Sequence, residues 1–185
     1  MLHIAAGRFK GIRLVTPPAI RATEGKVRQA IMNILGTSVA DARVLDGFAG
    51  SGALGIEALS RGAAFAAFIE SDGAGVIAIR DNLARIGPEL PRTAWRVLQM
   101  DVERGMRALA SSVAPFDVAL FDPPYRTLEG KKALNALNEY AMLATSGIAV
   151  VEHHRRDALP ESAGSLRLCK RHRYGDTVLS FYQQQ

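Results

Sequence analysis

The sequence predicts an α/β fold with a mostly parallel sheet, and three observations carry that prediction. Apolar runs of strand length alternate with segments whose apolar residues recur at helical spacing. A glycine-rich loop stands between the first of these strands and the helix that follows it. Acidic residues end four successive strands: Asp46, Glu70, Asp101 and Asp122. Asp is common where strands end in turns, but four such residues beside a glycine loop indicate a ligand site at the carboxyl ends of the strands.

Strands and helices are expected to alternate through the middle of the chain. The expected strands are residues 42–45, 64–69, 93–100, 116–121 and 148–151. The helices expected between them are residues 54–59, 74–86, 102–109 and 131–143, and a further helix is expected at 27–35. Strands that alternate with helices pair in parallel, through right-handed crossover connections.

Both ends of the chain are expected to form hairpins. Near the start, two apolar segments flank Gly7-Arg8, which indicates a small β-hairpin. Near the end, two segments flank Tyr174-Gly175-Asp176, which indicates a second hairpin that closes the sheet in an antiparallel manner. The hairpin strands are expected at residues 2–6 and 9–15, and at residues 165–172 and 177–182.

Length and composition limit the class of protein. The 185 residues fit one domain, and 48% apolar and 22% charged residues are ordinary for a soluble globular protein. No apolar run approaches the roughly 18 residues of a membrane span, and the first residues lack the apolar segment of a signal peptide. A single cysteine, Cys169, excludes an internal disulfide and a zinc site built from several cysteines. We expect a cytoplasmic protein without a metal site.

Positive charge is concentrated at the two ends of the chain. The net charge is +5, and the first 29 residues alone carry Arg8, Lys10, Arg13, Arg21, Lys26 and Arg28 against Glu24. The middle of the chain is slightly acidic, and the last segment is basic again. Basic ends favour a surface that binds phosphates, although a solvated surface that keeps the protein soluble would have the same composition.

The glycine-rich loop runs from Asp46 to Gly55. Its glycines fit the pattern G-x-G-x-x-G after a strand and before a helix, and Glu70 lies about 20 residues further on. Glycines allow a tight turn and close approach to a ligand, and an acidic side chain at that distance can accept hydrogen bonds from a ribose. The loop therefore predicts a nucleotide-like cofactor, either a dinucleotide or S-adenosylmethionine. It lacks the G-K-[ST] ending of a phosphate-binding P-loop.

A second motif, Asp122-Pro123-Pro124-Tyr125, follows the strand at 116–121. Prolines lack a backbone N–H and stiffen the chain, so the Asp122 carboxylate and the Pro123 carbonyl remain as rigid acceptors. Such a pair suits an exocyclic amine, which has two N–H donors, and Tyr125 adds a ring on which a base can stack. Because stacking needs only the ring, loss of the Tyr125 hydroxyl is expected to have little effect. A stiff turn with a surface tyrosine is the alternative, but the nearby glycine loop favours an amine site.

These motifs resemble those of class I S-adenosylmethionine-dependent methyltransferases that modify exocyclic amines. More closely, the whole chain resembles the small-subunit ribosomal RNA guanine-N2 methyltransferases of the RsmD family. The matching stretches are GRFKGIRL at 7–14, RATEGKVRQAIMNIL at 21–35, DGFAGSGALGIEALSRGA from Asp46, FDPPY from Phe121, VVEH at 150–153 and YGDTVLSFY at 174–182. The chain departs from the family pattern at Ala22, Gly25 and Gly47 and keeps the Asp122 motif intact.

The resemblance implies a Rossmann-like, seven-stranded, mostly parallel methyltransferase sheet with an antiparallel C-terminal hairpin. This domain would span residues 21–185, after a small N-terminal β-hairpin extension at residues 1–20. The resemblance further implies an S-adenosylmethionine site. Its expected residues are Thr23, Arg28, Asp46, Ala49, Gly50, Gly52, Glu70, Ser71, Asp101 and Val102. Glu70 would hold the ribose, and Asp101 would meet the adenine amino group.

The expected catalytic residues are Asp122, Pro123, Pro124 and Tyr125, which would hold the guanine amine and stack on its base. Arg8, Lys10 and Arg13 are the expected RNA-binding residues. The implied partner is 16S ribosomal RNA in the small ribosomal subunit or its late assembly intermediate, bound by a monomer. Alternatives are an amino-methyltransferase that acts on adenine N6 of DNA or RNA or on protein glutamine, a nicotinamide oxidoreductase, and a non-catalytic RNA-binding module. The last two do not explain the Asp122 motif.

Overall fold

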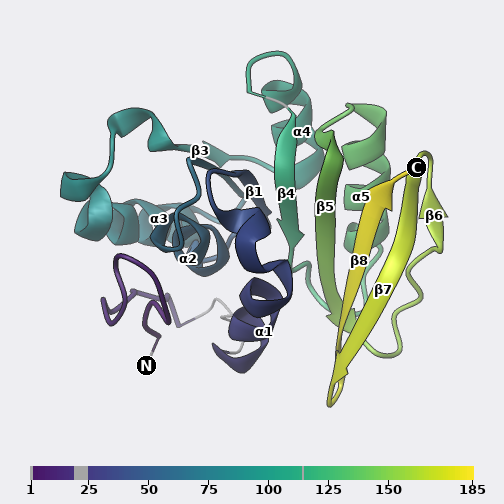
Figure 1. Cartoon of the computed structure of the whole chain (residues 1–185), viewed down its shortest axis with the longest axis horizontal. Helices are drawn as coiled ribbons and strands as arrows, with labels where there is room; N and C mark the ends of the chain where they lie inside the picture. Colours follow the sequence, from purple (N-terminus) through teal and green to yellow (C-terminus); the bar gives the residue numbers. More distant parts are fainter. Residues whose placement is uncertain (1, 19–24, 114) are drawn as a thin grey trace.

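The computed structural model describes residues 2–18, 25–113 and 115–185, and these form one mixed sheet flanked by helices (Figure 1). The strands of this part of the chain are β1 (Arg43–Gly47), β2 (Phe65–Glu70), β3 (Trp95–Gln99), β4 (Phe116–Phe121), β5 (Leu143–His154), β6 (Ser162–Ala163), β7 (Leu166–Tyr174) and β8 (Thr177–Gln184). The α-helices are α1 (Gly25–Leu35), α2 (Ala53–Ser60), α3 (Gly73–Ile86), α4 (Val102–Ala110) and α5 (Glu129–Glu139), and short 3-10 helices lie at Gly36–Val39, Gly87–Glu89 and Arg92–Ala94.

The strand order creates a switch point between β1 and β4. The order is β3-β2-β1-β4-β5-β8-β7-β6, with parallel pairing from β3 to β5 and antiparallel pairing from β5 onward. From β1 the chain proceeds outward through β2 and β3, and it then returns to place β4 on the other side of β1. Ligands of open α/β sheets bind outside the strand ends at such a point. The loops after β1 and β4, which carry both sequence motifs, therefore lie side by side.

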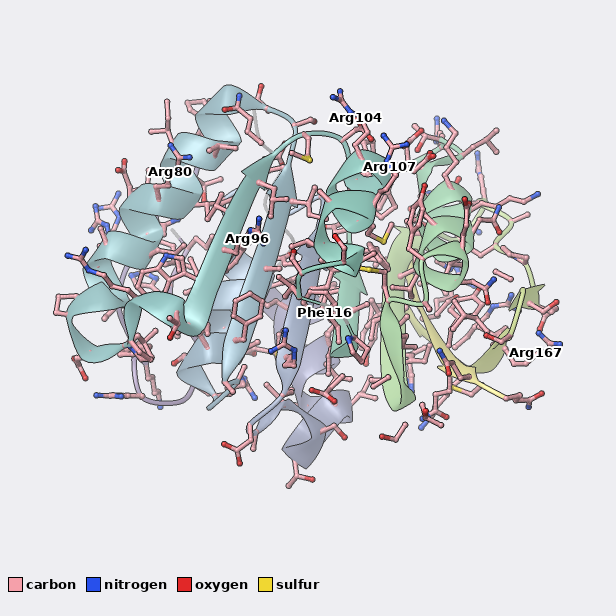
Figure 2. The ribbon with its side chains drawn as sticks, turned by 90° about the horizontal axis from the view of Figure 1, so that it is seen from above. Arg80, Arg96, Arg104, Arg107, Phe116 and Arg167 are labelled. Carbon is pink, nitrogen blue, oxygen red and sulfur yellow. The ribbon has the colours of Figure 1, made fainter. Side chains whose placement is uncertain are left out.

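The sheet separates two apolar cores. Successive side chains of a strand point to opposite faces, so Val44 of β1 joins the core on one face and Leu45 joins the core on the other. Apolar residues of α1, α2 and α3 complete the first core, and those of α4 and α5 complete the second. The outer faces of α3 and α4 are charged: Figure 2 shows Arg80 on α3 and Arg104 and Arg107 on α4 at the surface.

The prediction of an α/β fold with a mostly parallel sheet and an antiparallel C-terminal hairpin is confirmed. The sheet has one strand more than expected, because the two-residue β6 pairs with the start of β7. Two neighbouring boundaries were wrong: α5 ends at Glu139 rather than at residue 143, and β5 begins at Leu143 rather than at residue 148. Leu143 continues the apolar pattern of the helix, but it pairs with Phe116 across a register shift in the strand pair β4–β5.

The N-terminal segment folds back on itself and packs on α2. His3 and Arg13 form one antiparallel bridge, and the Ile4 amide donates to the Ile12 carbonyl at 3.0 Å. The prediction of strands at residues 2–6 and 9–15 was wrong, because only this isolated bridge forms within the described residues 2–18, and the turn between its two residues is longer than the expected Gly7-Arg8. Gly7 has a φ of 84°, and a Cβ atom on it would lie 1.8 Å from the Ser60 carbonyl oxygen at the end of α2. Only glycine allows this approach.

Three side chains of the N-terminal segment enter the core that α1, α2 and α3 share: Ile4, Phe9 and Leu14 are each buried there. Figure 1 shows the segment beside α1 and α2. Among the helices described, none has both the length and the apolar character needed to cross a membrane.

Candidate active site

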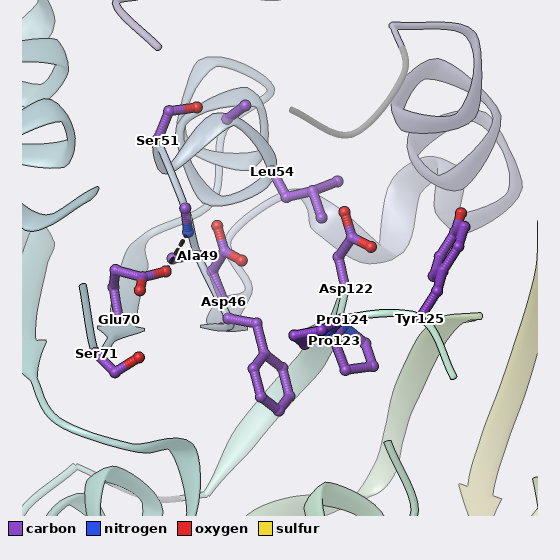
Figure 3. A pocket seen from close by; sticks show the side chains of 13 residues that line it. Asp46, Ala49, Ser51, Leu54, Glu70, Ser71, Asp122, Pro123, Pro124 and Tyr125 are labelled. Carbon is purple, nitrogen blue, oxygen red and sulfur yellow. Dashed lines mark hydrogen bonds between the residues drawn. The ribbon is translucent and has the colours of Figure 1, made fainter. Parts of the chain in front are cut away.

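A cavity of about 410 Å³ lies at the carboxyl ends of β1, β2 and β4 (Figure 3). Residues of the glycine-rich loop and of the Asp122 motif both line it. Its lining residues are Asp46, Phe48, Ala49, Gly50, Ser51, Ala53, Leu54, Glu70, Ser71, Asp122, Pro123, Pro124 and Tyr125. Ligand sites commonly have volumes of about 300–1,000 Å³, so a nucleotide-sized molecule fits the space.

The glycine loop turns from β1 into α2 through left-handed backbone conformations. Gly50 has a φ of 56°, and Gly52, which caps the N-terminus of α2, has a φ of 77°. Gly52 does not line the cavity, because a Cβ atom there would point into the core and lie 3.2 Å from Ile79. Gly55 brings α2 close to the sheet, since a Cβ atom on it would lie only 2.4 Å from the Phe68 ring. The three glycines thus serve the turn and the packing of α2.

Glu70 at the end of β2 holds the glycine loop in place. One carboxylate oxygen accepts a hydrogen bond from the Gly50 amide at 2.7 Å, the contact drawn as a dashed line in Figure 3. The other oxygen accepts from the Asp72 amide at 2.7 Å, at the start of α3. Because each carboxylate oxygen has two lone pairs, Glu70 can still accept from a ligand in the cavity.

Asp46 at the end of β1 is almost completely buried at the base of the cavity. Its Oδ2 accepts a hydrogen bond from the Gly55 amide at 2.8 Å. Burial raises the pKa of Asp46 well above its usual range. The Gly55 hydrogen bond lowers this pKa, and the charges of Asp122 and Glu70 raise it. Three carboxyl groups therefore converge on one cavity, and the negative charge that favours a positively charged ligand comes from Glu70 and Asp122.

The Asp122 motif forms the wall of the cavity that faces the glycine-rich loop. Pro123 is buried and Pro124 is exposed, and the two hold Asp122 and Tyr125 on either side of a stiff turn. Figure 3 shows the Asp122 carboxylate and the Tyr125 ring pointing to the same side, with Asp122 next to Leu54. An acceptor beside an aromatic ring is suited to a planar base that carries an amine.

Sequence reasoning gave no role to two residues that contact this wall. The Tyr125 hydroxyl lies 2.8 Å from Oε1 of Glu152, on β5, and 2.9 Å from Oγ1 of Thr177, on β8. The stretches VVEH and YGDT contain these residues, but sequence alone does not indicate that both approach Tyr125. The cavity-lining residues Phe48, Ser51, Ala53 and Leu54 were missed as well.

Several expected cofactor residues lie outside the main cavity. Asp101 and Val102 line a smaller hollow of about 180 Å³, which shares Phe48 with the main cavity. The Asp101 carboxylate caps α4 by accepting from the Arg104 amide at 2.9 Å. Thr23 falls outside the described residues, as does Ala22.

Arg28 does not line the cavity, contrary to what a cofactor ligand would require. It is buried between the N-terminal segment and α2, where Nη2 donates to the His3 carbonyl at 2.7 Å and Nε lies 3.7 Å from Glu57. Burial lowers the pKa of Arg28, the charge of Glu57 raises it, and the charge of Arg61 lowers it. The described contacts of Arg28 join the N-terminal segment, α1 and α2.

The three expected RNA-binding residues are exposed on the N-terminal segment, and none of them lines the cavity. The Arg8 guanidinium lies over the Phe9 ring, 5.5 Å from its centre, and pairs with Glu89 at 2.9 Å. Lys10 and Arg13 are exposed as well. The segment therefore presents cations to solvent away from the carboxylates of the cavity.

Solved structures with this architecture have been described from several bacteria. The chain superposes on "Putative methyltransferase yhhF from Escherichia coli" with a TM-score of 0.85 and 33% identity, over 100% of this chain and 98% of that chain. It superposes on a hypothetical protein of Thermus thermophilus with a TM-score of 0.84 and 28% identity, over 99% of both chains.

Sequence relatives match over the same extent. The chain is 36% identical to "Putative rRNA methyltransferase YlbH" of Bacillus subtilis (strain 168), over 100% of both sequences. It is 33% identical to "Ribosomal RNA small subunit methyltransferase D" of Escherichia coli (strain K12), over 100% of this chain and 90% of that protein. The model of the family described as "Conserved hypothetical protein 95" matches residues 2–183. The chain therefore belongs to this family of RsmD-like methyltransferases, as its motifs predicted.

Proposed function

We propose that this protein transfers a methyl group from S-adenosylmethionine to the exocyclic N2 amine of a guanine in 16S ribosomal RNA. The observation that carries the proposal is the cavity at the switch point, where the loop held by Glu70 faces the Asp122 motif. The names of the relatives from Bacillus subtilis and Escherichia coli, which refer to ribosomal RNA methylation, support the substrate class.

The residues of the cavity fit S-adenosylmethionine. This cofactor carries a positive sulfonium and a positive amino group, and Glu70 and Asp122 supply negative charge around the cavity. Gly50 lines the cavity without a side chain, and Glu70 retains lone pairs for ribose hydroxyls. The neighbouring hollow, with Asp101 and Val102, would receive the adenine. When bound, the cofactor supplies an already activated methyl group.

The chain itself supplies position and charge. The Asp122 carboxylate and the Pro123 carbonyl accept from the two N–H groups of the guanine amine, and Tyr125 stacks on the base. Holding the amine in line at near-attack distance replaces an encounter in solution with an intramolecular step. Acceptance by Asp122 also makes the nitrogen more nucleophilic and stabilises the positive charge that develops on it. Asp122 acts either by orienting the amine or by taking its proton after transfer.

The proposed partner is the small ribosomal subunit or its late assembly intermediate, in the cytoplasm, and the resemblance to the RsmD family implies guanine 966 as the target. The protein acts as a monomer in this proposal, and Arg8, Lys10 and Arg13 contact RNA phosphates. Each of these features can be tested separately from the chemistry of the cavity.

Labelled S-adenosylmethionine and small subunits that lack the modification test the proposal directly. After incubation, the RNA is digested and its nucleosides are separated, and we expect the label in N2-methylguanosine. Mapping the modified nucleotide then identifies the target. Label in N6-methyladenosine would instead assign an adenine amine, and an absence of label in RNA would contradict the proposal. Free 16S ribosomal RNA, assayed in parallel, distinguishes naked RNA from the assembled subunit as substrate.

A further inference from the structure

We infer that Glu152 and Thr177 are positioning residues that lock the Tyr125 ring against the cavity. The inference rests on the proposed function, because the locked ring matters if a base stacks on it. It assigns a role to the phenolic hydroxyl of Tyr125, because stacking on a base involves only the ring.

The hydrogen-bond directions around this hydroxyl follow from its single proton. The Tyr125 hydroxyl donates to Oε1 of Glu152 at 2.8 Å. It therefore accepts from the Thr177 hydroxyl, whose Oγ1 lies 2.9 Å away. The resulting chain runs from Thr177 through Tyr125 to Glu152, and each oxygen lies within the usual range for such bonds.

The two partners of Tyr125 are buried on paired strands of the sheet. Glu152 is 3% exposed on β5, and Thr177 is 8% exposed on the adjacent strand β8. Strands β5 and β8 lie side by side (Figure 1), and they pair so that Glu152 lies opposite Leu179 and His154 lies opposite Thr177. Buried side chains on paired strands have little freedom, so the two oxygens define a fixed point in space. The distal end of the Tyr125 side chain is tied to that point.

The proximal end of Tyr125 is fixed by the chain around it. Pro123 and Pro124 restrict the backbone before the ring. After the ring, the Thr127 hydroxyl donates to the Pro124 carbonyl at 2.7 Å, and the Arg126 amide donates to Asp157 at 3.2 Å. The ring is thus held at both ends while it lines the cavity. A group whose orientation is set before the substrate arrives loses little entropy on binding.

This geometry changes the sequence-based expectation for Tyr125→Phe. Phenylalanine keeps the stacking surface but loses both hydrogen bonds, so the ring can turn away and Glu152 loses a buried contact. We expect the single-turnover rate of methyl transfer at saturating S-adenosylmethionine to fall about tenfold. A positional error of about 1 Å is enough for a larger loss.

Thr177 provides a cleaner test, because it lies outside the cavity. Thr177→Val keeps the shape and removes the hydroxyl, whereas Thr177→Ser keeps the hydroxyl. Thr177→Val should have a transfer rate several-fold lower than that of the unmodified protein, and Thr177→Ser should have a rate close to it. The double variant Tyr125→Phe/Thr177→Val should be no slower than the slower single variant, because both remove the same interaction. Tyr140→Phe, which removes a hydroxyl at the end of α5, is the matched control and should leave the rate unchanged.

A merely structural role for the hydrogen bonds would give a different result. It would lower the melting temperature and weaken cofactor binding together with the rate. The positioning role lowers the transfer rate and raises the KM for small subunits, while the rise in melting temperature caused by S-adenosylmethionine stays the same. Unchanged rates in Tyr125→Phe and Thr177→Val would overturn the inference, and so would equal losses of cofactor binding and rate.

A measurement without substrate separates this inference from the proposed function. The chain has four tyrosines, and the aromatic NMR signals of Tyr125 are identified by their disappearance in Tyr125→Phe. Those signals should indicate a restricted ring in the unmodified protein and in Thr177→Ser, and a mobile ring in Thr177→Val. A mobile ring in the unmodified protein would overturn the lock by itself. A restricted ring in a protein that methylates no ribosomal RNA would instead overturn the proposed function.

Discussion

The Glu70 carboxylate accepts the backbone N–H of Gly50 at 2.7 Å, across the gap between the end of β2 and the loop after β1. The same carboxylate accepts the Asp72 amide at the start of α3. One side chain therefore sets the relative positions of two loops that line the cavity. Its expected role as a ribose ligand depends on this arrangement, because only a fixed carboxylate presents its remaining lone pairs in one direction.

Glu70→Ala should weaken cofactor binding and destabilise the protein. Two amides lose their acceptor, and each hydrogen bond of this kind contributes about 1.5–3 kcal/mol when its acceptor is charged. Glu70→Gln should keep part of the effect, since its carbonyl oxygen can accept one amide. Calorimetric titration with S-adenosylmethionine and urea unfolding give the two quantities. Glu139→Ala, at the exposed end of α5, is the control, and equal affinities for Glu70→Ala and this control would contradict the prediction.

Gly55→Ala should destabilise the fold because α2 has no room for a methyl group at this position. The added Cβ would lie 2.4 Å from the buried Phe68 ring and 3.1 Å from Oδ2 of Asp46. Overpacking of a closely packed core costs about 1–3 kcal/mol, which urea unfolding measures. Gly25→Ala serves as the control, since a Cβ atom there meets nothing within 4 Å. Similar unfolding midpoints for the two variants would show that α2 can move away from the sheet.

The raised pKa of Asp46 predicts how stability depends on pH. The folded protein holds the Asp46 proton at pH values where the unfolded chain has lost it, so burial of this group costs stability as pH rises. The loss begins near the unfolded pKa of about 3.9 and is complete above the raised folded pKa. Asp46→Asn cannot ionise, so its stability should fall less over this range than that of the unmodified protein. Urea unfolding at a series of pH values tests this, and parallel pH profiles would contradict it.

The order of strands and helices could be predicted because it depends on local patterns. Apolar periodicity and the acidic residue at each strand end are visible within short windows of sequence, and β1, β2 and β4 lie where they were expected. The end of α5 could not be predicted in the same way. Leu143 fits the helical pattern, and only its pairing with Phe116, a contact between distant segments, places it in β5.

The residues of the candidate site also fall into those that local patterns identify and those that only contacts between distant segments reveal. Asp46, Glu70 and Asp122 were identified because each follows a strand, and parallel strands place their ends at one edge. Glu152 and Thr177 were not, since neither lies in the loops after β1 and β4. They reach Tyr125 through the antiparallel pair β5–β8, whose register sequence patterns do not specify. Local motifs thus predict the groups that face the ligand better than the groups that hold them.

Arg8, Lys10 and Arg13, replaced together by alanine, should weaken binding to small subunits and flatten its dependence on salt. Each phosphate contact changes the slope of log K against log salt by about 0.7–0.9, so three lost contacts change it by about 2–3. The Arg8–Glu89 pair is exposed on both sides, and such pairs add little to stability, so the fold should remain intact. Filter binding at several salt concentrations measures the slope.

The matched control for this surface replaces Arg80, Arg107 and Lys131, which are exposed on α3, α4 and α5. It removes the same charge from another part of the molecule. We expect a smaller change in slope from the control. Equal changes would mean that RNA binding reflects net charge rather than the N-terminal segment.

Asp122→Ala should fold, bind S-adenosylmethionine and lose most of its methyl transfer activity. The Asp122 carboxylate lines the cavity at the end of β4, and the prolines that follow hold it there. Loss of one such preorganised group commonly costs about 10²–10³ in rate. Single-turnover methylation of small subunits at saturating S-adenosylmethionine measures this loss apart from product release.

Asp122→Asn separates the two roles that the carboxylate can have. Asparagine keeps an acceptor oxygen but lacks the negative charge and cannot take a proton. If orientation of the amine dominates, Asp122→Asn should keep part of the activity that Asp122→Ala loses. If charge dominates, the two variants should be equally slow, because neither stabilises the positive nitrogen that forms during transfer. Wild-type rates in Asp122→Ala, with the cofactor-induced rise in melting temperature intact, would place the chemistry elsewhere and leave the Asp122 motif as a stiff turn after β4.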